Sequence, residues 1–388
     1  MTYPPNEAPP SPCPQGYAAR RLVDVTMFWS NGPGGVARYL QSKGEWLRRR
    51  SDWNQTIFVP GPESRPDRVR SPRLPFSGGY RLPWRRRAAA RQLVALAPDL
   101  IEAGDPYRLA WSAIDASDQT GARLAAFCHS DVEQLAADEG GRAARLIARR
   151  YLLHVYRHFD VVFAASRWMA VRLRDLGLDN VRQQPLGVDL STFNPSRRDA
   201  RWRQDRHFEL DDFLLIYAGR FSSEKNLDVL TQVVDRLGPP FRLLLLGQGP
   251  VQPTGSRVHC LASTTRPREV ATALASADAF VHAGVNETFG LAPLEALACG
   301  TPVVARGRGA VSELLCGDAG IAVDSAGITP FCEAIAALRD GERVKQRAAA
   351  RACALPYAQD AVYSRLLDCY DDLAGRQTVR WSLPAVYA

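Results

Sequence analysis

The residues best suited to chemistry lie between Phe280 and Val304, where two carboxylates flank a tight turn. Glu287 precedes the turn, and Glu295 follows it in a stretch with helical character. A helix that begins at a glycine-containing turn presents unpaired backbone N–H groups and the positive end of its dipole. Such a terminus suits a phosphate or an electron-rich sugar hydroxyl. Glu295 would then lie about 9 Å along the helix, at ~1.5 Å per residue, which suits hydrogen bonds from a ribose.

The surrounding sequence predicts the elements that hold these carboxylates. Residues 279–282 form a short apolar run, which is typical of a buried parallel strand. A helix is predicted over residues 289–299, because Gly300 suits a left-handed C-terminal cap and Pro302 cannot continue the helix. The expected order is therefore strand, turn, helix, turn and strand.

The same alternation of strands and helices runs through the chain, and it predicts an α/β protein with parallel, doubly wound sheets. Ligands bind such sheets at the carboxyl ends of the strands. His129 follows one of these ends, and the other histidines have no comparable position. The further predicted strands cover residues 21–28, 55–60, 99–103, 122–127, 160–164, 181–185, 213–218, 241–246 and 258–261.

Two loops that follow predicted strands have the composition of phosphate sites. Arg220 and Lys225 combine a forked donor with a point charge, a pair that suits a diphosphate. Gly34 and Gly35 end a glycine-rich turn after the first strand, where the backbone can approach a phosphate closely. The alternatives are a pair of solvated cations and an ordinary tight turn.

The string from Asn286 to Val304 resembles the signature of glycosyltransferase family 4, whose members are retaining enzymes with the GT-B fold. The glycine pair, His129, the segment Gly187-Val-Asp-x-x-x-Phe-x-Pro195 and the Arg220–Lys225 loop resemble companion motifs in the family's order. The resemblance covers nearly the whole chain from about residue 20. It implies two Rossmann-like, doubly wound parallel-sheet domains that face each other across a cleft.

The resemblance also implies a domain plan. Residues 1–19 are expected to be a disordered leader, residues 20–195 an acceptor domain and residues 196–388 a nucleotide-sugar domain. The last helices, from about residue 356, are expected to pack back on the first domain. Residues 262–267 correspond to the segment that usually holds the nucleotide base.

By the same resemblance, His129 and Glu287 act on the transferred sugar, and a helix terminus and two cations hold the diphosphate. No Asp-x-Asp motif occurs, so no obligatory metal and no cofactor beyond the sugar donor are expected. The implied catalytic residues are His129 and Glu287. The implied donor-binding residues are Gly34, Gly35, Arg220, Lys225, Thr288, Phe289, Gly290, Leu291 and Glu295.

Positive charge is concentrated in the first half of the chain. Residues 1–200 hold 29 Lys and Arg against 20 Asp and Glu, a net charge of 29 − 20 = +9, and the remainder of the chain carries −1. Residues 64–91 contain nine arginines and one acid, Asp67. Such a segment can bind an anionic membrane, bind nucleic acid, or remain a solvated loop. No nucleic-acid module is recognisable, so we expect a membrane or acceptor surface at Trp84, Arg85, Arg86 and Arg87.

The chain of 388 residues is long enough for two domains. No run of about 18 or more apolar residues predicts a spanning helix, and no secretory signal is recognisable. Eight cysteines are scattered singly, so we expect them to be reduced and to form no zinc site. These features favour a cytoplasmic protein, with peripheral binding to the inner face of the plasma membrane as a further expectation.

The expected function is retaining transfer of a hexose from UDP-hexose or GDP-mannose to a membrane lipid, with diacylglycerol as the favoured acceptor. The alternative is a mannosyl- or glucosyltransferase that acts on a polysaccharide, a glycolipid or a small molecule. A glycoside hydrolase with Glu287 and Glu295 as acid and base is a rival from another class. It is disfavoured because it gives Arg220 and Lys225 no purpose.

Overall fold

The computed structural model describes residues 19–29, 34–73, 80–209, 211–262, 266–325 and 327–375. Its contacts divide the chain into two compact units. The first comprises the described residues of Met1–Ala126, His158–Asp160 and Tyr363–Ala388, and the second those of Phe127–Arg157 and Val161–Val362. The predicted domain boundaries stay predictions.

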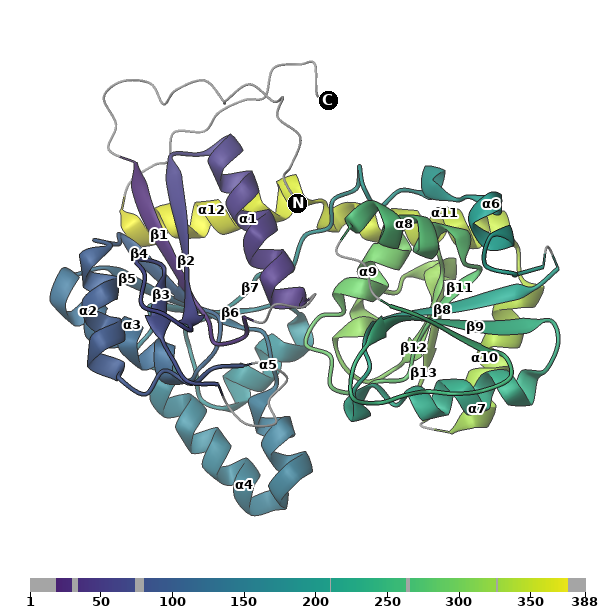
Figure 1. The fold of residues 1–388 in the computed structure, drawn as a ribbon, viewed down its shortest axis with the longest axis horizontal. Coiled ribbons are helices and arrows are strands. Elements are labelled where there is room, and N and C mark those ends of the chain that lie inside the picture. Colours follow the sequence, from purple (N-terminus) through teal and green to yellow (C-terminus); the bar gives the residue numbers. More distant parts are fainter. Residues whose placement is uncertain are drawn as a thin grey trace. The chain divides into compact units, whose positions relative to one another are not determined.

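A seven-stranded sheet is built from the first half of the chain in the order β3-β2-β1-β4-β5-β6-β7 (Figure 1). β1 pairs in parallel with both β2 and β4, and its residues Leu22, Val23 and Val25 are buried. Such continuous burial is typical of parallel strands covered on both faces. The strands are β1 Arg20–Val25, β2 Trp53–Gly61, β3 Arg68–Arg70, β4 Leu100–Ala103, β5 Arg123–Cys128, β6 Val161–Ala164 and β7 Val181–Gln183.

The helices that alternate with these strands bury one apolar face each. In α1, the side chains of Ala37, Tyr39, Leu40 and Leu47 recur at helical spacing and are buried. The helices are α1 Gly35–Arg50, α2 Arg86–Ala95, α3 Arg108–Thr120, α4 Val132–Tyr156 and α5 Arg167–Asp175.

A six-stranded sheet follows in the order β10-β9-β8-β11-β12-β13 (Figure 1). β8 is central and pairs in parallel with β9 and β11. Its core is aliphatic and aromatic, with Leu215, Tyr217, Leu243 and Val281 fully buried. The strands are β8 Phe213–Arg220, β9 Phe241–Gln248, β10 Val258–Leu261, β11 Ala279–His282, β12 Val303–Arg306 and β13 Gly320–Val323.

The remaining helices belong mostly to this second half. They are α6 Ala200–Gln204, α7 Leu227–Leu237, α8 Pro267–Ser276, α9 Leu291–Ala298, α10 Ile328–Asp340, α11 Arg343–Ala354 and α12 Gln359–Ala374, with short 3-10 turns η1 Pro195–Arg197, η2 Ser223–Lys225, η3 Ala310–Leu314, η4 Gly317–Ala319 and η5 Leu355–Tyr357. The parallel α/β architecture expected from the sequence is therefore confirmed.

The structure corrects two predicted element boundaries near the candidate site. Strand β8 runs on to Arg220, which was expected in a loop. Helix α9 begins at Leu291 instead of residue 289, because Gly290 has a φ of 94° and cannot be part of an α-helix. In the first unit, helix α2 begins at Arg86, so the end of the arginine-rich segment is helical.

One buried ion cluster connects α12 with the first sheet inside the first unit. Lys43 Nζ donates to Asp24 (2.6 Å), Glu102 (2.8 Å) and the Tyr370 hydroxyl (3.0 Å). Tyr370 in turn donates to Glu102 at 2.6 Å. All four side chains are almost fully buried. A single lysine thus faces two carboxylates in the core, with a tyrosine from the C-terminal helix completing the network.

The cysteines correct a further expectation. Cys316 and Cys353 form a disulfide, with their Cα atoms 6.1 Å apart, whereas the scattered spacing predicted reduced thiols throughout. The fold brings Cys316 and Cys353 close together, and their spacing along the chain does not reveal this. Cys128 and Cys299 are buried free thiols. Within the described ranges, no helix is both long and apolar enough to span a bilayer.

Candidate functional site

The candidate site lies in the second unit, where β8 and β11 end and the loop before α9 begins. Gly284 shows how tightly this region is built, because a Cβ atom there would lie 2.9 Å from His282 Cε1 and 3.2 Å from the Glu224 carbonyl oxygen. The loop therefore passes close to the strand end that carries His282. The carboxyl ends of parallel strands are where such sheets bind ligands.

Glu287 is held by a lysine and a histidine from two other elements. Lys225 Nζ donates to its Oε1 atom, and His282 Nε2 lies 3.2 Å from the same oxygen. Burial raises the pKa of Glu287, but attraction to Lys225 and the hydrogen bond with His282 outweigh it, so the pKa lies well below its usual range. Glu287 is therefore a carboxylate with a defined orientation at neutral pH.

Arg220 has a carboxylate partner of its own. Its guanidinium lies 3.2 Å from Glu224, which also accepts a hydrogen bond from Ser222 at 2.6 Å. The Tyr217 hydroxyl donates to the Arg220 carbonyl oxygen at 3.0 Å and anchors the end of β8. Because Lys225 is paired with Glu287, both cations predicted to hold a diphosphate are already ion-paired. A diphosphate would compete with Glu224 and Glu287 for them.

The turn before α9 is tied to the strand end that carries His129. The Thr288 hydroxyl donates to the His129 carbonyl oxygen at 2.8 Å, and the Ser166 hydroxyl donates to the Thr288 carbonyl oxygen at 2.8 Å. The imidazole of His129 stacks on Phe127, with the ring centroids 4.4 Å apart. His129 and the turn are thus brought together by contacts within one unit.

Phe289 and Gly290 shape this turn. Phe289 is buried and packs edge-on against Tyr357, 5.8 Å between ring centroids. Gly290 is the N-cap of α9 in a left-handed conformation, and a Cβ atom there would approach Val311 to 2.8 Å. Within the described residues, we find no acceptor for the backbone N–H groups of Thr288, Phe289 and Gly290. Leu291 is the first helical residue.

Glu295 occupies a different position from the one expected. It lies four residues after Leu291, or about 6 Å along the axis at ~1.5 Å per residue, instead of two full turns. Glu295 is buried, and only 4% of the residue is exposed. Contact with a ribose stays a prediction for Glu295, and little of this carboxylate reaches the surface.

Gly34 and Gly35 lie in the first unit at the start of α1, with Gly34 as its N-cap. Among the described residues, nothing lies within 4 Å of a Cβ atom built at either position, so none of them requires glycine there. Most of the preceding turn, residues 30–33, lies outside the described residues, as do residues 263–265 of the segment expected to hold the base and residues 1–18 of the expected leader.

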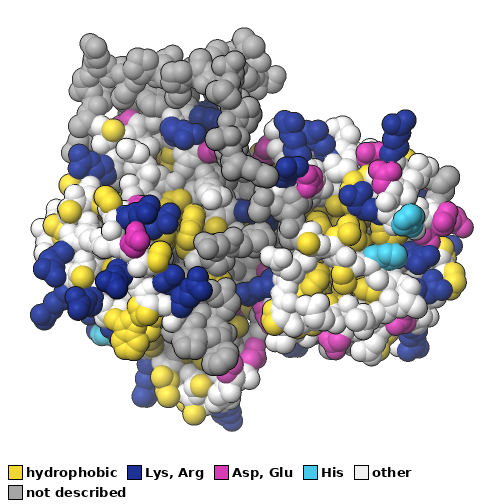
Figure 2. Space-filling view, in the orientation of Figure 1, with side chains coloured by type: hydrophobic (Ala, Val, Ile, Leu, Met, Phe, Trp, Pro, Cys, Tyr) yellow, Lys and Arg dark blue, Asp and Glu magenta, His cyan; other side chains and the backbone are white. Residues whose placement is uncertain are grey.

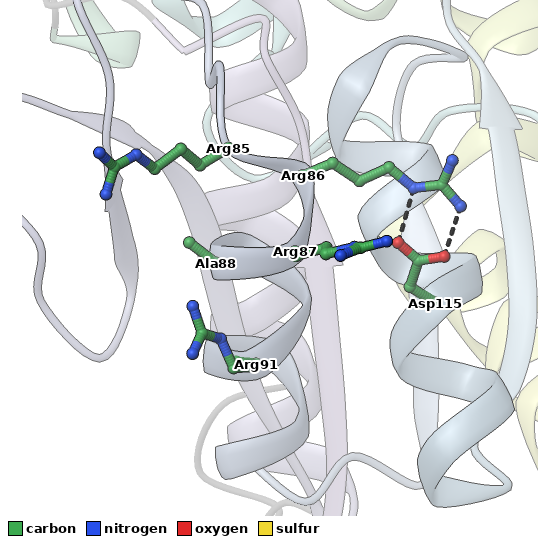
Figure 3. Close-up of a pocket in the computed structure, with 6 residues that line it drawn as sticks. All are labelled: Arg85, Arg86, Arg87, Ala88, Arg91 and Asp115. Carbon is green, nitrogen blue, oxygen red and sulfur yellow. Dashed lines mark hydrogen bonds and ion pairs between the residues drawn. The ribbon is translucent and has the colours of Figure 1, made fainter.

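The arginine-rich segment forms a pocket of about 550 Å³ at the start of α2 (Figure 3). Arg86 points toward α3, where Nε donates to Asp115 at 2.6 Å and the guanidinium stacks on Trp111 at 5.0 Å. Arg86 therefore holds two helices together. Trp84 is 64% exposed, and Arg85, Arg87 and Arg91 are exposed as well. The predicted surface thus consists of Trp84, Arg85 and Arg87, with Arg91 added and Arg86 turned toward the protein.

Sequence reasoning missed two side chains that support the site. His282 ends β11, and the rule that selected His129, a polar residue at the carboxyl end of a strand, would have found it. Glu313 accepts hydrogen bonds from the N–H groups of Arg167 and Trp168 and so caps α5 beside Ser166. No spacing in the sequence links Glu313 to α5. In the part of the chain that the structure describes, no group of three or more His, Cys, Asp or Glu side chains is arranged to hold a metal ion.

Comparison with known proteins finds two family models in succession. The model for "Glycosyltransferase Family 4" matches residues 33–192, and that for "Glycosyl transferases group 1" matches residues 199–353. A GDP-mannose-dependent α-(1-6)-phosphatidylinositol dimannoside mannosyltransferase from Mycobacterium tuberculosis is 31% identical over 333 residues, covering 79% of this chain and 84% of the relative. A D-inositol 3-phosphate glycosyltransferase from Xylanimonas cellulosilytica is 33% identical over 245 residues, covering 57% of this chain and 59% of the relative.

Solved structures share the fold at low sequence identity. Sucrose-phosphate synthase from Thermosynechococcus elongatus superposes with a TM-score of 0.73 at 19% identity, over 92% of this chain and 99% of that one. Anabaena HepE, solved with UDP and glucose, gives 0.69 at 16% identity, over 91% and 99%. The two parallel α/β sheets have the GT-B architecture of these neighbours. The two family models and the mycobacterial relative make the chain a glycosyltransferase, an enzyme that transfers a sugar from a nucleotide sugar. The chain belongs to glycosyltransferase family 4.

Proposed function

We propose that this enzyme transfers mannose from GDP-mannose to an inositol-containing membrane lipid, with retention at the anomeric carbon. The observation that carries the proposal is the likeness to the phosphatidylinositol dimannoside mannosyltransferase, which extends over 84% of that relative. Two further GDP-mannose-dependent α-mannosyltransferases, from Mycobacterium tuberculosis and Mycolicibacterium smegmatis, are 29% and 28% identical. They support the donor, and the inositol phosphate enzyme supports an inositol-bearing acceptor.

The chemistry assigned to the site is electrostatic. In the transfer, the bond between the sugar C1 and the diphosphate oxygen breaks while a bond from C1 to the acceptor hydroxyl oxygen forms, and the proton of that hydroxyl passes to the leaving diphosphate. Negative charge develops on the leaving diphosphate, and Arg220 and Lys225 are the cations assigned to stabilise it. The free N–H groups of Thr288 to Gly290 are assigned to donate hydrogen bonds to the oxygens of the same diphosphate. No metal is assigned a role.

Two side chains are assigned to the sugar. Glu287 is a carboxylate of lowered pKa whose orientation is set by Lys225 and His282, so it can accept hydrogen bonds from sugar hydroxyls. His129 is assigned to the transferred sugar because its backbone is joined to Thr288 in the same turn. Glu295 is assigned to the ribose. Its contact would stabilise the bound donor equally in the ground state and in the transition state.

We further propose that the enzyme docks on an anionic membrane through Trp84, Arg85, Arg87 and Arg91. These exposed side chains combine an aromatic ring with cations at the start of α2. Each arginine near an anionic surface contributes about 1 kcal/mol, and the attraction decays within a Debye length. The docking would place a lipid acceptor within reach without a spanning helix.

The decisive experiment supplies purified enzyme with radiolabelled GDP-mannose or UDP-glucose. Each donor is paired with vesicles that contain phosphatidylinositol, phosphatidylinositol dimannoside or diacylglycerol, and the lipids are then separated. We expect label from GDP-mannose in an inositol lipid. Label in diacylglycerol alone would replace the acceptor with the one favoured from sequence, and transfer only from UDP-glucose would overturn the donor. Product linkage determined by NMR tests retention.

A further inference from the structure

Helix α4 carries an exposed apolar pair that the proposed function does not use. The helix is bent at Gly141, whose φ of 65° interrupts it, and Figure 1 shows it as two helical segments. The second segment, Arg142–Tyr156, begins with two turns that are largely exposed. Leu146 is 61% and Ile147 is 70% exposed. Among the exposed large apolar side chains of the described residues, only Leu146 and Ile147 are adjacent in the sequence.

The charges of this segment are all of one sign. Between Arg142 and Tyr156 the sequence contains four arginines and no acid. Arg145 and Arg149 pair with Glu133 from the first segment of α4, whereas in the described part of the chain no ion pair joins Arg142 or Arg150. At 100° per residue, Arg142, Leu146, Ile147 and Arg150 share one face of the helix. We name these four residues the α4 face.

We propose that the α4 face inserts into an anionic lipid bilayer. Leu146 and Ile147 would enter the boundary between headgroups and acyl chains, and the guanidinium groups of Arg142 and Arg150 would bind lipid phosphates while their stems lie along the apolar surface. Charge complementarity selects this occupant, because a segment with only positive charge favours a negatively charged surface. In Figure 2, apolar and basic side chains occur together at the lower end of the molecule, where α4 lies in Figure 1.

The first segment of α4 is anchored in a way that leaves this face free. Asp138 accepts a hydrogen bond from Asn286 at 2.7 Å, and Glu133 holds Arg145 and Arg149. Leu152, Val155 and Tyr156 are buried at the other end of the helix. The α4 face is thus presented between two anchored ends. Asn286 precedes Glu287, so insertion of α4 would occur one hydrogen bond away from the loop of the candidate site.

This proposal rests on the proposed function only in that a lipid acceptor gives the surface a use. Vesicle binding tests it without any sugar transfer. The full chain is mixed with vesicles of equal parts phosphatidylcholine and phosphatidylglycerol, and with vesicles of phosphatidylcholine alone, and the bound fraction is measured by sedimentation. Failure of lipid mannosylation with intact vesicle binding would reject the proposed function and keep the α4 face.

The matched pair of variants is Ile147→Glu and Val344→Glu. Val344 lies in α11, is 86% exposed and receives the same change of charge. We expect Ile147→Glu to weaken binding to the anionic vesicles at least about tenfold, since an ionised side chain cannot enter the acyl region. Val344→Glu should bind like wild type. Circular dichroism of both variants checks folding.

A direct readout comes from Ile147→Trp in bilayers with brominated acyl chains. We expect quenching of the added tryptophan fluorescence and a shift of its emission to shorter wavelength, with Val344→Trp unchanged. The proposal is overturned if wild type does not bind the anionic vesicles, if Ile147→Glu binds as tightly as wild type, or if the tryptophan at position 147 stays unquenched. It is also overturned if Ile147→Glu converts a dimer in vesicle-free solution to a monomer, since the face then binds a second copy.

Discussion

At the scale of single residues, the central feature is the carboxylate of Glu287 between Lys225 and His282. Lys225 supplies charge and His282 a hydrogen bond, and both act on the same oxygen atom. The other oxygen of the carboxylate takes part in neither of these two contacts. This arrangement explains why the pKa of Glu287 is low in spite of its burial.

Replacing Glu287 by Gln should reduce kcat about 100-fold or more while changing the donor KM much less. The amide keeps the size of the side chain but loses the charge that orients the sugar, and loss of an interaction made in the transition state lowers kcat. Steady-state kinetics with GDP-mannose measures both constants. Glu295→Ala is the control, for which a raised KM with a nearly unchanged kcat is expected. The reverse pattern would exchange the two roles.

Replacing Lys225 by Met should move the acidic limb of the pH profile of kcat/KM to higher pH. Lys225 lowers the pKa of Glu287, so its removal raises that pKa, and the carboxylate is protonated at a pH where it is still ionised in wild type. Rates of this variant are compared with wild type from pH 4 upward, as a ratio at each pH. An equal loss at every pH would mean that Lys225 does not govern the charge of Glu287.

Replacing Arg220 by Ala should weaken binding of the nucleoside diphosphate about tenfold or more. A hydrogen bond to a charged group contributes about 1.5–3 kcal/mol, and ~1.4 kcal/mol corresponds to a factor of ten. Part of this is offset because, in wild type, the diphosphate must compete with Glu224 for Arg220. Calorimetry with GDP on folded protein gives the affinity. Unchanged affinity would remove Arg220 from the diphosphate site.

At the scale of elements, the C-terminal helix α12 completes the core of the first unit. Tyr363 contacts Ser42 of α1 at 3.2 Å, and Tyr370 contacts Lys43 and Glu102. Burial raises the pKa of Asp24 to about 7, because the attraction of Lys43 compensates only part of the lost hydration. The packing of α12 therefore depends on a charge network as well as on apolar contacts.

Replacing Lys43 by Met should destabilise the protein by about 3–5 kcal/mol, the usual cost of removing one partner from a buried ion network. Two buried carboxylates then lose their common cation, although the volume of the side chain is nearly kept. Chemical denaturation at pH 7 measures the free energy of unfolding. Tyr370→Phe is the milder comparison, with about 1–3 kcal/mol expected for a lost buried hydrogen bond. A smaller loss for Lys43→Met than for Tyr370→Phe would contradict this account.

At the scale of the whole molecule, the charge is divided between +9 in the first 200 residues and −1 in the rest. Exposed arginines are therefore more abundant in the half of the chain that carries α2 and α4. Many weak contacts act together at a membrane, so each is small and the sum is sensitive to salt. Arg86 differs from Arg85 and Arg87 because it is paired with Asp115, although 40% of its side chain remains exposed.

Replacing Arg85 and Arg87 by Ser should weaken binding to anionic vesicles about tenfold or more, at about 1 kcal/mol for each arginine. Transfer to a vesicle-borne acceptor should slow accordingly, and donor hydrolysis without acceptor should be unchanged. Arg86→Ser is the matched control. It removes the contacts of Arg86 with Asp115 and Trp111, so its main effect should be a lower free energy of unfolding and not weaker binding to vesicles. Equal binding by wild type and the double variant would exclude this segment from docking.

The sequence alone determined the parallel α/β architecture and the family, and it predicted most of the candidate site residues. Short apolar runs predict buried strands, because the residues of such a strand are shielded from water on both faces. Strands β10 and β11 have the predicted bounds. The string around Glu287 and Glu295 resembled the family because these residues, the turn and the helix are contiguous. Positions close in sequence are necessarily close in space, so local motifs can be recognised without a structure.

Only the tertiary structure decided which residues share a contact across long separations. Lys225 and Glu287 are 62 residues apart, and Thr288 and His129 are 159 apart. The pairing of Cys316 with Cys353, the cluster around Lys43 and the inward turn of Arg86 are of the same kind. Chain packing sets these contacts, and one sequence does not encode them in its spacing. The low pKa of Glu287 follows from such contacts, so it too required the fold.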